Sequence, residues 1–414
     1  MGFVELLKAY YNPSKTQTDK FTAFLDATVL SKKKGMSTLG GYFYENPLNF
    51  SETGDKVFYF MLIHAELVKV IKTGKTGLML EIDQTASGVM FLSYLLRNKK
   101  MAEKSNALGG AQSCPYTYCM DKFKHFYDNK MITGNEEAFR FLSSNRKLHK
   151  YALMCYCYAQ THVGRIYDFN EHWFSSFGRN PSVEERKVLK EFAVSYGDFI
   201  NHVFPGTMKQ LQVIYKVVGM VGDDLGYLPF KNLQGETFLW TFYKHKKTSR
   251  SSYDPISSKV KPYNSYKFHE VQFAVDSQLE SEEGGFNKRL VRDSTTFRRK
   301  CLSYFIHCID ASMMHRFIHD MRDKHGYTIN HLHDCVMLHP NFVGHFFDEV
   351  RVIYSTEELY DVSDDLLFNH ISNLVSTDTK LKICKEVEKF KQSSDNYRES
   401  VKNANPKHIY HYEK

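Results

Sequence analysis

The sequence predicts an α+β fold that is mostly helical, and three observations support this class. Hydrophobic residues make up 42% and charged residues 25% of the 414 residues, as in an ordinary globular protein. Apolar residues recur at helical spacing through most of the chain between residue 87 and about residue 225. Strand patterns are clear only in two short segments, 78–83 and 327–338. Helices with a small sheet are therefore expected.

The strand segments border on helical ones. Leu78–Asp83 alternates apolar residues with others, and a helix with an apolar stripe is expected to begin near Ser87. A second helix is expected at about Thr295–Lys324, directly before a strand-turn-strand at Tyr327–Leu338. Segment 245–290 is polar and predicts a long loop or a hairpin.

The charge of the chain leaves its partners open. The formal net charge is +8, which over this length is a mild excess and is typical of a solvated surface. Clusters of basic residues beside apolar or turn-like stretches also suit a polyanionic partner. These clusters are Lys32–Lys34, Arg97–Lys100, Lys244–Lys247 and Arg298–Lys300.

Cysteine usage and hydropathy predict a cytoplasmic protein. The eight cysteines form no CxxC pair, and the CxC of Cys155 and Cys157 has no second half at zinc-site spacing. Buried free thiols are therefore expected. The first residues lack the apolar segment of a signal peptide, and no uncharged apolar run reaches the roughly 18 residues of a membrane span.

A carboxylate stands at the end of the first expected strand. Asp83 is followed by Thr-Ala-Ser-Gly and a helix, so its side chain is expected in the space beyond the sheet edge. Ligands and metals commonly bind there. An Asp just before a helix is also a typical helix cap, so the residue alone leaves both interpretations open.

The second strand segment carries a His-Asp pair at its turn. Apolar residues flank His333 and Asp334, which predicts a buried hairpin with an acid at its tip. Burying an unpaired carboxylate is costly and favours a metal or hydrogen-bond partner. Asp83 and Asp334 on neighbouring strands would be able to bridge two magnesium ions for an in-line displacement. A purely structural pair is the alternative.

A short basic helix is expected between these two acids. It begins at Arg186, has Lys190 four residues later on the same face, and ends in Tyr196-Gly197. Two cations at this spacing suit the phosphates of a nucleotide. A solvated amphipathic helix fits the same pattern.

Together these motifs resemble those of the single-subunit, phage-type RNA polymerases, which are related to mitochondrial RNA polymerases. The resemblance spans roughly residues 55–355 and keeps the order of the family's motifs. The matching segments are Asp83-x-x-x-Ser87-Gly88, Arg186-x-x-x-Lys190 with Tyr196-Gly197, His307-x-x-Asp310-x-Ser312, and His333-Asp334 before an apolar strand. Leu239–Lys244 resembles the stretch that leads into the family's promoter-reading hairpin, which would lie at about 245–290; a solvent-exposed linker is the alternative.

The resemblance implies a right-hand polymerase with an antiparallel palm and helical fingers. It implies that Asp83 and Asp334 ligate two Mg²⁺ ions and that His333 shapes the hairpin at the primer end. It also implies that Lys190 and Arg186 contact the phosphates of the incoming nucleotide.

The same resemblance implies how ribose is selected. Tyr196, followed by Gly197, would close over the nucleotide, and His307 would lie near the 2′-hydroxyl. Ser87 and Gly88 would border the substrate. Related DNA polymerases carry a Glu at the position of Gly88, where it blocks that hydroxyl. Gly88 leaves room, so ribonucleotides are the predicted substrates.

Two features depart from the family. Lys190 lies six residues before Tyr196, two fewer than usual, so Lys187 is an alternative phosphate ligand. Only 82 residues precede Asp83, and none of them contains the family's Asp-x-x-Gly-Arg motif. The thumb and amino-terminal domain are therefore expected on a second chain, unless this chain is a fragment. This division resembles the larger subunit of the heterodimeric RNA polymerase II of phage N-four and its relatives.

The expected enzyme is the catalytic subunit of a DNA-directed RNA polymerase in the host bacterial cytoplasm. Its expected partners are the second subunit, a DNA template, the nascent RNA, NTPs and a single-stranded-DNA-binding helper, without a membrane. A metal-dependent nuclease and a non-catalytic nucleic-acid-binding subunit are the alternatives. The expected parts are palm segments 1–104 and 295–355, fingers 105–294, and a helical segment 356–414.

Overall fold

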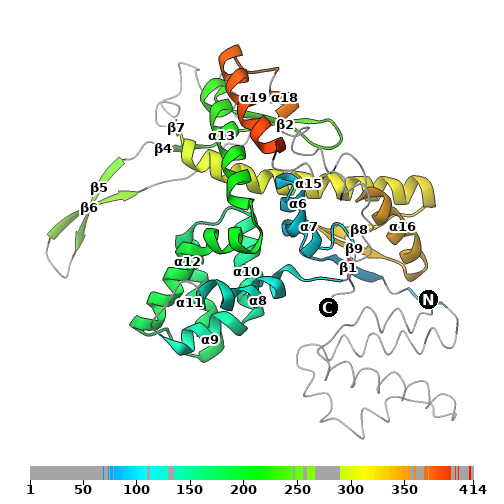
Figure 1. Cartoon of the computed structure of the whole chain (residues 1–414). Coiled ribbons are helices and arrows are strands. Elements are labelled where there is room, and N and C mark those ends of the chain that lie inside the picture. Colours follow the sequence, from blue (N-terminus) through cyan, green and yellow to red (C-terminus); the bar gives the residue numbers. More distant parts are fainter. Residues whose placement is uncertain are drawn as a thin grey trace, which may run out of the picture. The chain divides into compact units, whose positions relative to one another are not determined.

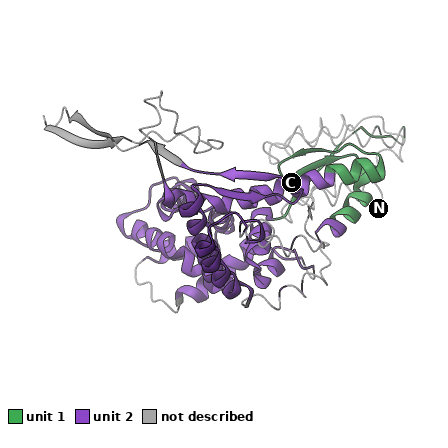
Figure 2. Cartoon of the chain, turned by 90° about the horizontal axis from the view of Figure 1, so that it is seen from above, with its two compact units in different colours: residues 1–85, 318–350, 410–414 green, residues 86–317, 351–409 purple. Residues whose placement is uncertain are grey.

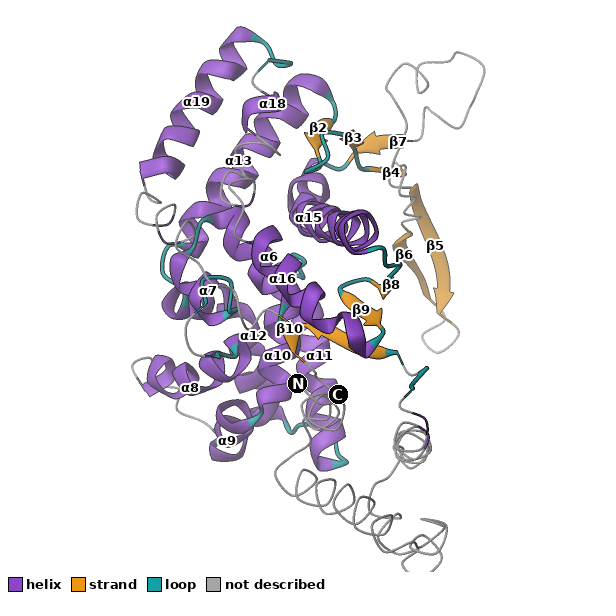
Figure 3. Ribbon diagram, turned by 90° about the vertical axis from the view of Figure 1, so that its right-hand side faces the viewer, coloured by secondary structure: helices purple, strands orange, loops and turns teal. Residues whose placement is uncertain are grey.

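A computed structural model describes most of the chain after residue 78. The described ranges are 79–109, 112–128, 135–245, 248–254, 259–265, 290–354, 368–371 and 373–392, with Tyr410–His411 and a few isolated positions; between residues 243 and 292 only the backbone is described. Within them the chain is mostly helical with small antiparallel sheets, which confirms the predicted α+β class (Figures 1 and 3). None of the helices in these ranges is both long and apolar enough to cross a membrane.

The chain divides into two compact units, each built from separate stretches of sequence (Figure 2). Unit 1 comprises residues 1–85, 318–350 and 410–414, and unit 2 comprises residues 86–317 and 351–409. Both predicted metal-binding acids, Asp83 and Asp334, fall in unit 1. The predicted nucleotide-binding residues from Ser87 to His307 fall in unit 2.

The sheet of unit 1 has the strand order β10-β1-β9-β8. β1 (Leu80–Gln84) runs antiparallel to β9 (Cys335–Leu338) and to β10 (Tyr410–His411), and β9 pairs with β8 (Asn330–Leu332). Alternate residues of β1 and β9 are buried, as period-two patterning requires. The predicted strand and the predicted strand-turn-strand are both confirmed.

The expectation of a buried hairpin was wrong for one of its two strands. All three residues of β8 are exposed, and Leu332 keeps 63% of its surface accessible. The reason is the position of β8 at the sheet edge, beyond β9, whose Val336 and Leu338 supply the burial.

Helices complete unit 1. The predicted helix at 295–324 is confirmed as α15 (Ser294–His325), whose last turns from Ile318 onward belong to this unit. η3 (Pro340–Phe342) leads from β9 into α16 (Val343–Ile353), which lies beside the sheet (Figures 1 and 3). Lys324 Nζ and His325 Nε2 lie 2.8 and 3.0 Å from the carboxylate of Glu349, joining α15 to α16.

Unit 2 is a helical body with short strand pairs. Its helices before residue 226 are α6 (Ser87–Leu96), α7 (Lys99–Lys104), α8 (Pro115–Asp128), α9 (Glu136–Ser144), α10 (Arg146–Cys157), α11 (His162–Phe177), α12 (Val183–Val203) and α13 (Thr207–Leu225). The first part of α15, α18 (Asn369–Ile371) and α19 (Thr377–Gln392) follow. Its core is aromatic around Phe123 and Phe192, whose rings meet edge to face at 4.9 Å.

Three strand pairs follow α13 in sequence. β2 (Leu228–Lys231) pairs with β3 (Thr237–Trp240), β4 (Tyr243–His245) with β7 (Leu290–Arg292), and β5 (Thr248–Asp254) with β6 (Lys259–Ser265). The last pair confirms a hairpin within the predicted segment 245–290, whereas residues 266–289 lie outside the described ranges. The first 68 residues of the predicted palm segment also lie outside them.

All eight cysteines are free thiols, as predicted, but only three of them are buried: Cys119, Cys157 and Cys301.

Candidate functional site

Asp83 is the penultimate residue of β1 and is half-buried. It lies on the strand face opposite the fully buried Leu80 and Ile82. The N-cap of the following helix α6 is Ala86, which adopts a left-handed φ of 55° and makes no side-chain capping hydrogen bond. The N-cap position of α6 is therefore occupied by Ala86 and not by Asp83, which lies three residues earlier in β1.

Asp334 lies in the two-residue turn between β8 and β9. Leu332 pairs with Cys335, so His333 and Asp334 alone form the loop. His333 has a φ of 54°, the left-handed region that a tight hairpin turn requires and that most side chains disfavour. The turn thus holds His333 exposed and Asp334 half-buried beside the first residue of β9.

Strand register brings the two acids together. Leu80 pairs with Leu338 and Ile82 with Val336. Continuing this register by one residue places Asp83 opposite Cys335, the direct neighbour of Asp334. Adjacent strands lie about 4.8 Å apart. The backbones at Asp83 and Asp334 therefore lie close to each other at one end of the sheet of unit 1.

This pair of acids has the donor chemistry that magnesium uses. Mg²⁺ is usually held by one or two carboxylates, with waters and substrate phosphates completing its coordination. Among the described residues, no three or more His, Cys, Asp or Glu side chains form a group that could hold a metal ion by themselves. Thr85, two residues after Asp83, has a buried hydroxyl without a hydrogen-bond partner in the described part of the chain. The residues present fit an ion that binds together with its substrate.

In unit 2, α12 carries the predicted fingers residues on two different faces. Arg186, Lys187 and Lys190 are exposed, whereas Phe192 and Tyr196 are fully buried. At about 100° per residue, six residues of helix separate Lys190 and Tyr196 by about 120°, whereas eight residues would separate them by only about 80°. The short spacing noted in the sequence therefore turns Tyr196 away from the basic face.

Tyr196 lies inside the helical core of unit 2. The ring centroids of Tyr196 and Tyr156 lie 5.8 Å apart, and Cζ of Arg165 lies 5.3 Å from the Tyr196 ring centroid. Burial raises the pKa of the Tyr196 hydroxyl well above its usual range. That hydroxyl has no hydrogen-bond partner among the described residues. A buried hydroxyl without a hydrogen-bond partner is rare in native proteins and needs an explanation.

Arg165 fixes α11 against α12. Its Nε donates to the carbonyl of Ala193 at 3.2 Å and its Nη1 to the carbonyl of Gln160 at 2.8 Å. It is 7% exposed, and this burial lowers its pKa. The Gly164-Arg165 string, which matches only the last two residues of the family's Asp-x-x-Gly-Arg motif, is thus a structural element of the helical core.

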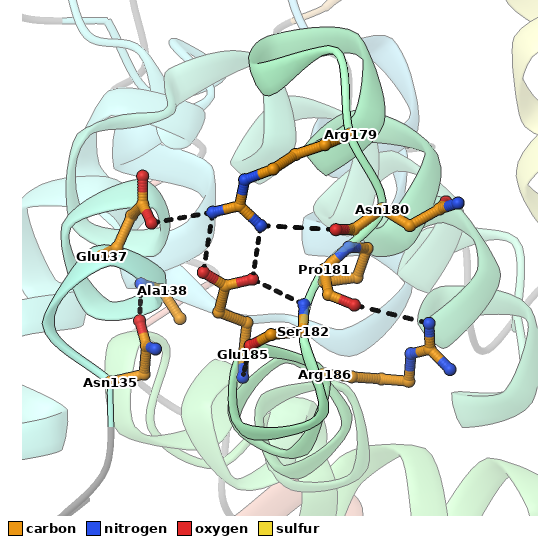
Figure 4. A network of polar contacts seen from close by, with 9 residues as sticks. All are labelled: Asn135, Glu137, Ala138, Arg179, Asn180, Pro181, Ser182, Glu185 and Arg186. Atoms are coloured by element: carbon orange, nitrogen blue, oxygen red, sulfur yellow. Dashed lines mark hydrogen bonds and ion pairs between the residues drawn. The ribbon is translucent and has the colours of Figure 1, made fainter.

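The start of α12 is held by a charged network (Figure 4). Ser182 and Glu185 form a capping box, in which Ser182 N donates to Glu185 Oε2 at 2.6 Å. Arg179 binds both oxygens of Glu185 at 2.8 Å and also Glu137 of α9 at 2.8 Å. The hydrogen bonds from Arg179 lower the pKa of Glu185 to about 2. This network orients the exposed basic face of α12.

Replacing Glu185 with Gln is expected to lower the free energy of unfolding at neutral pH by about 1 kcal/mol, the typical value of a helix-capping interaction. Because the folded pKa of about 2 lies below the ordinary 4.5, the contribution of this carboxylate is complete above pH 4.5 and disappears as the pH falls toward 2. Urea unfolding of wild type and variant at several pH values measures this. Glu184→Gln, the exposed neighbour, is the control, and equal decreases in both variants would contradict the network's role.

A second cluster in unit 2 surrounds Gly88. A Cβ built on Gly88 would lie 3.0 Å from the hydroxyl and 3.4 Å from Cζ of Tyr158. The ring of Tyr158 in turn stacks on the exposed imidazole of His307, with centroids 5.0 Å apart and planes 29° apart. The sequence led us to expect open space beside Gly88, but Tyr158 occupies the room that the missing side chain leaves.

The His307 segment anchors this cluster. His307 points outward from α15, and Ser312 points inward, where it is 2% exposed and its Oγ accepts from Leu233 N at 3.3 Å. Trp240 packs its ring 3.9 Å from Tyr304 of the same helix. Trp240, in the segment that leads into the predicted hairpin at 245–290, thus packs against α15, the helix that carries His307.

Tyr158 is the residue that sequence reasoning missed. Tyr158 belongs to none of the motifs that resemble the polymerase family. In the sequence it is marked only by its position directly after the CxC of Cys155 and Cys157. Only packing between distant segments brings it to Gly88 and His307.

Comparison with known proteins adds no assignment: the chain matches no protein-family model and no curated protein.

Proposed function

We propose that this chain is the catalytic subunit of a DNA-directed RNA polymerase, joining ribonucleotides by magnesium-dependent nucleotidyl transfer. The observation that carries the proposal is the register of β1 and β9, which places Asp83 beside the His333-Asp334 turn. A palm built on the sheet of unit 1 and fingers built on α12 are part of this proposal.

Each residue has a defined part in the proposed reaction. Asp83 and Asp334 hold the metal ions, and the left-handed His333 positions Asp334 at the tip of the turn. Two such ions supply activation of the attacking 3′-hydroxyl and charge stabilisation on the departing pyrophosphate. Arg186, Lys187 and Lys190 are exposed and available to bind triphosphate oxygens.

Ribose recognition is proposed for the residues around Gly88. His307 is exposed and held by Tyr158, so its imidazole is oriented before any nucleotide binds. Tyr196 reaches a nucleotide only if the end of α12 rearranges, since it is fully buried here. Its orphan hydroxyl supports such a second arrangement, in which the 2′-hydroxyl of the substrate would satisfy it.

The proposed partners follow from the proposed reaction. They are a second subunit with the thumb and the Asp-x-x-Gly-Arg region, a DNA template, the nascent RNA, NTPs, and a single-stranded-DNA-binding helper. Co-purification of the chain with the product of a neighbouring reading frame would identify the second subunit.

The decisive test supplies the chain, with any co-purifying subunit, with a labelled RNA primer on a DNA template, Mg²⁺ and either rNTPs or dNTPs. Template-dependent extension with a preference for rNTPs supports the proposal. Equal use of dNTPs overturns the choice of RNA, shortening of the labelled strand indicates a nuclease, and binding without extension indicates a non-catalytic subunit.

Replacing Tyr196 with Phe is expected to separate stability from ribose selection. The free energy of unfolding should stay equal or rise by up to about 1 kcal/mol, because an unsatisfied buried hydroxyl is removed. Discrimination between rNTP and dNTP should fall about tenfold, the value of one hydrogen bond of about 1.4 kcal/mol.

The matched control for this variant is Tyr156→Phe. The Tyr156 hydroxyl contacts Met208 Sδ at 3.2 Å and is not orphaned. That variant should keep the wild-type discrimination. Unchanged discrimination in Tyr196→Phe as well would show that Tyr196 is only a core residue.

A further inference from the structure

A basic pocket of about 470 Å³ lies in unit 2 between α13, α15 and α19. None of the residues that line it is one of the predicted site residues. Five basic and two acidic side chains line it, together with Gly219 and Met220. The charged residues are Lys216, Asp223, Arg298, Lys382, Lys385, Glu386 and Lys389. No aromatic side chain contributes to the lining among the described residues.

Ion pairs organise the walls of this pocket but leave positive charge in excess. The carboxylate oxygens of Glu386 lie 2.9 Å from Lys389 Nζ and 3.5 Å from Lys216 Nζ, so one carboxylate forms ion pairs with two ammonium groups. Asp223 lies 3.2 Å from Arg298. Lys382 pairs with Asp378, which does not line the pocket. The side chain of Lys385 is exposed and makes no hydrogen bond or ion pair within the described ranges. The pocket therefore presents a cation that is held by its helix and is not neutralised.

Side chains of α15 pack closely against two glycines of α13 beside the pocket. A Cβ on Gly219 of α13 would lie 2.7 Å from Nε of Arg298, and one on Gly222 would lie 2.5 Å from the ring of Phe297. Glycine at these positions lets the side chains of Arg298 and Phe297 pack directly against α13. The guanidinium of Arg298 thereby lies against α13 where it lines the pocket, with 44% of its side chain exposed.

We propose that this pocket binds the phosphodiester backbone of a single nucleic-acid strand. The excess of lysine and arginine suits phosphate oxygens. The lack of aromatic residues removes base stacking, the main sequence-tolerant contact of other single-strand grooves. A pocket of this volume accepts a few sugar-phosphate units of one strand, whereas a rigid duplex is too wide to enter it. The contact is therefore electrostatic and independent of sequence.

This inference rests on the proposed function only in expecting a nucleic-acid partner, and binding can be tested without catalysis. The full-length chain is titrated into fluorescently labelled single-stranded RNA, single-stranded DNA and duplex DNA in the absence of Mg²⁺, at several salt concentrations. The substitution is Lys385→Glu, and the control is Lys380→Glu, an exposed lysine on the same helix that does not line the pocket.

The expected result is a several-fold higher Kd of Lys385→Glu for single strands, with the control close to wild type. The slope of log K against log salt should become shallower by about 0.7 for each phosphate that the variant no longer neutralises. Equal Kd values for both variants would overturn the proposal. Displacement of the strand from wild type, but not from Lys385→Glu, by free ATP or pyrophosphate at low concentration would also overturn it, in favour of a free-phosphate site.

The polymerase assignment and the pocket assignment can fail independently of each other. Asp334→Asn should bind single strands as wild type does, because Asp334 belongs to unit 1 and the pocket to unit 2. If nucleotidyl transfer is absent but binding still depends on Lys385, only the polymerase assignment fails. If transfer is present and binding ignores Lys385, only the pocket assignment fails.

Discussion

Replacing Asp334 with Asn is expected to lower RNA extension by roughly 10³-fold or more. The amide keeps the size of the side chain but removes the charge that would bind the metal ions. Metal ions supply several kcal/mol of charge stabilisation in such transfers, and each 1.4 kcal/mol corresponds to about tenfold in rate. Asp83→Asn should have a similar effect because the register of β1 and β9 places both acids at one end of the sheet. Single-turnover extension of a labelled primer measures the rate.

Folding and template binding must be unchanged for this result to count. Asp334 lies half-buried in a turn, so the free energy of unfolding should change little. Asp323→Asn is the matched control: it removes a carboxylate from the same unit, where Asp323 is exposed on α15 and forms an ion pair with its neighbour Arg322 at 2.6 Å. Extension that survives Asp334→Asn with wild-type rate would disprove the catalytic assignment.

Replacing Gly88 with Ala is expected to impair both stability and nucleotide use. The added Cβ would press on the hydroxyl of Tyr158 at 3.0 Å, and forcing such close approaches typically costs about 1–3 kcal/mol. Displacing the Tyr158 ring disturbs its stack on His307. Ribonucleotide incorporation should therefore fall, by about tenfold if positioning worth about 1.4 kcal/mol is removed. Urea unfolding and rNTP extension measure the two effects.

A double-mutant cycle makes this prediction specific. Tyr158→Phe removes the hydroxyl that lies nearest to the added Cβ and leaves the ring carbon at 3.4 Å. In the Gly88→Ala background it should restore about 0.5 kcal/mol or more of stability, the coupling typical of residues in contact. Extension should recover in parallel if His307 acts through its stack on Tyr158. Recovery of stability without recovery of extension would make Tyr158 a packing residue only.

The sequence predicted most of the local structure correctly. Period-two alternation identified β1, and apolar runs around the His-Asp turn identified the strands beside Asp334. Helical periodicity identified the start of α6 and both ends of α15 within one residue. These successes share a cause: alternation and 3.6-residue periodicity record which residues share a face, and that is decided over a few residues of chain. The exposure of β8 was missed because its place at the sheet edge depends on the order of strands.

The candidate site was predictable only in part. The carboxylates at strand ends and the basic face of α12 follow from short patterns. The burial of Tyr196 does not, because it depends on the core made by Tyr156, Arg165 and Phe192 around it. Likewise, the packing of Tyr158 against Gly88 joins residues from α6 and from the end of α10.

By itself, then, the sequence determined an α+β chain whose two strand-end acids and basic helix suit nucleotidyl transfer. The tertiary structure alone decided that Asp83 lies at the same end of the sheet as the turn with Asp334, that Tyr158 fills the space at Gly88, and that lysines of α19 line a pocket together with Arg298. The physical reason is that local periodicity selects the face a residue occupies. The choice of partner for that face is made by strand register and side-chain packing between segments far apart in the chain.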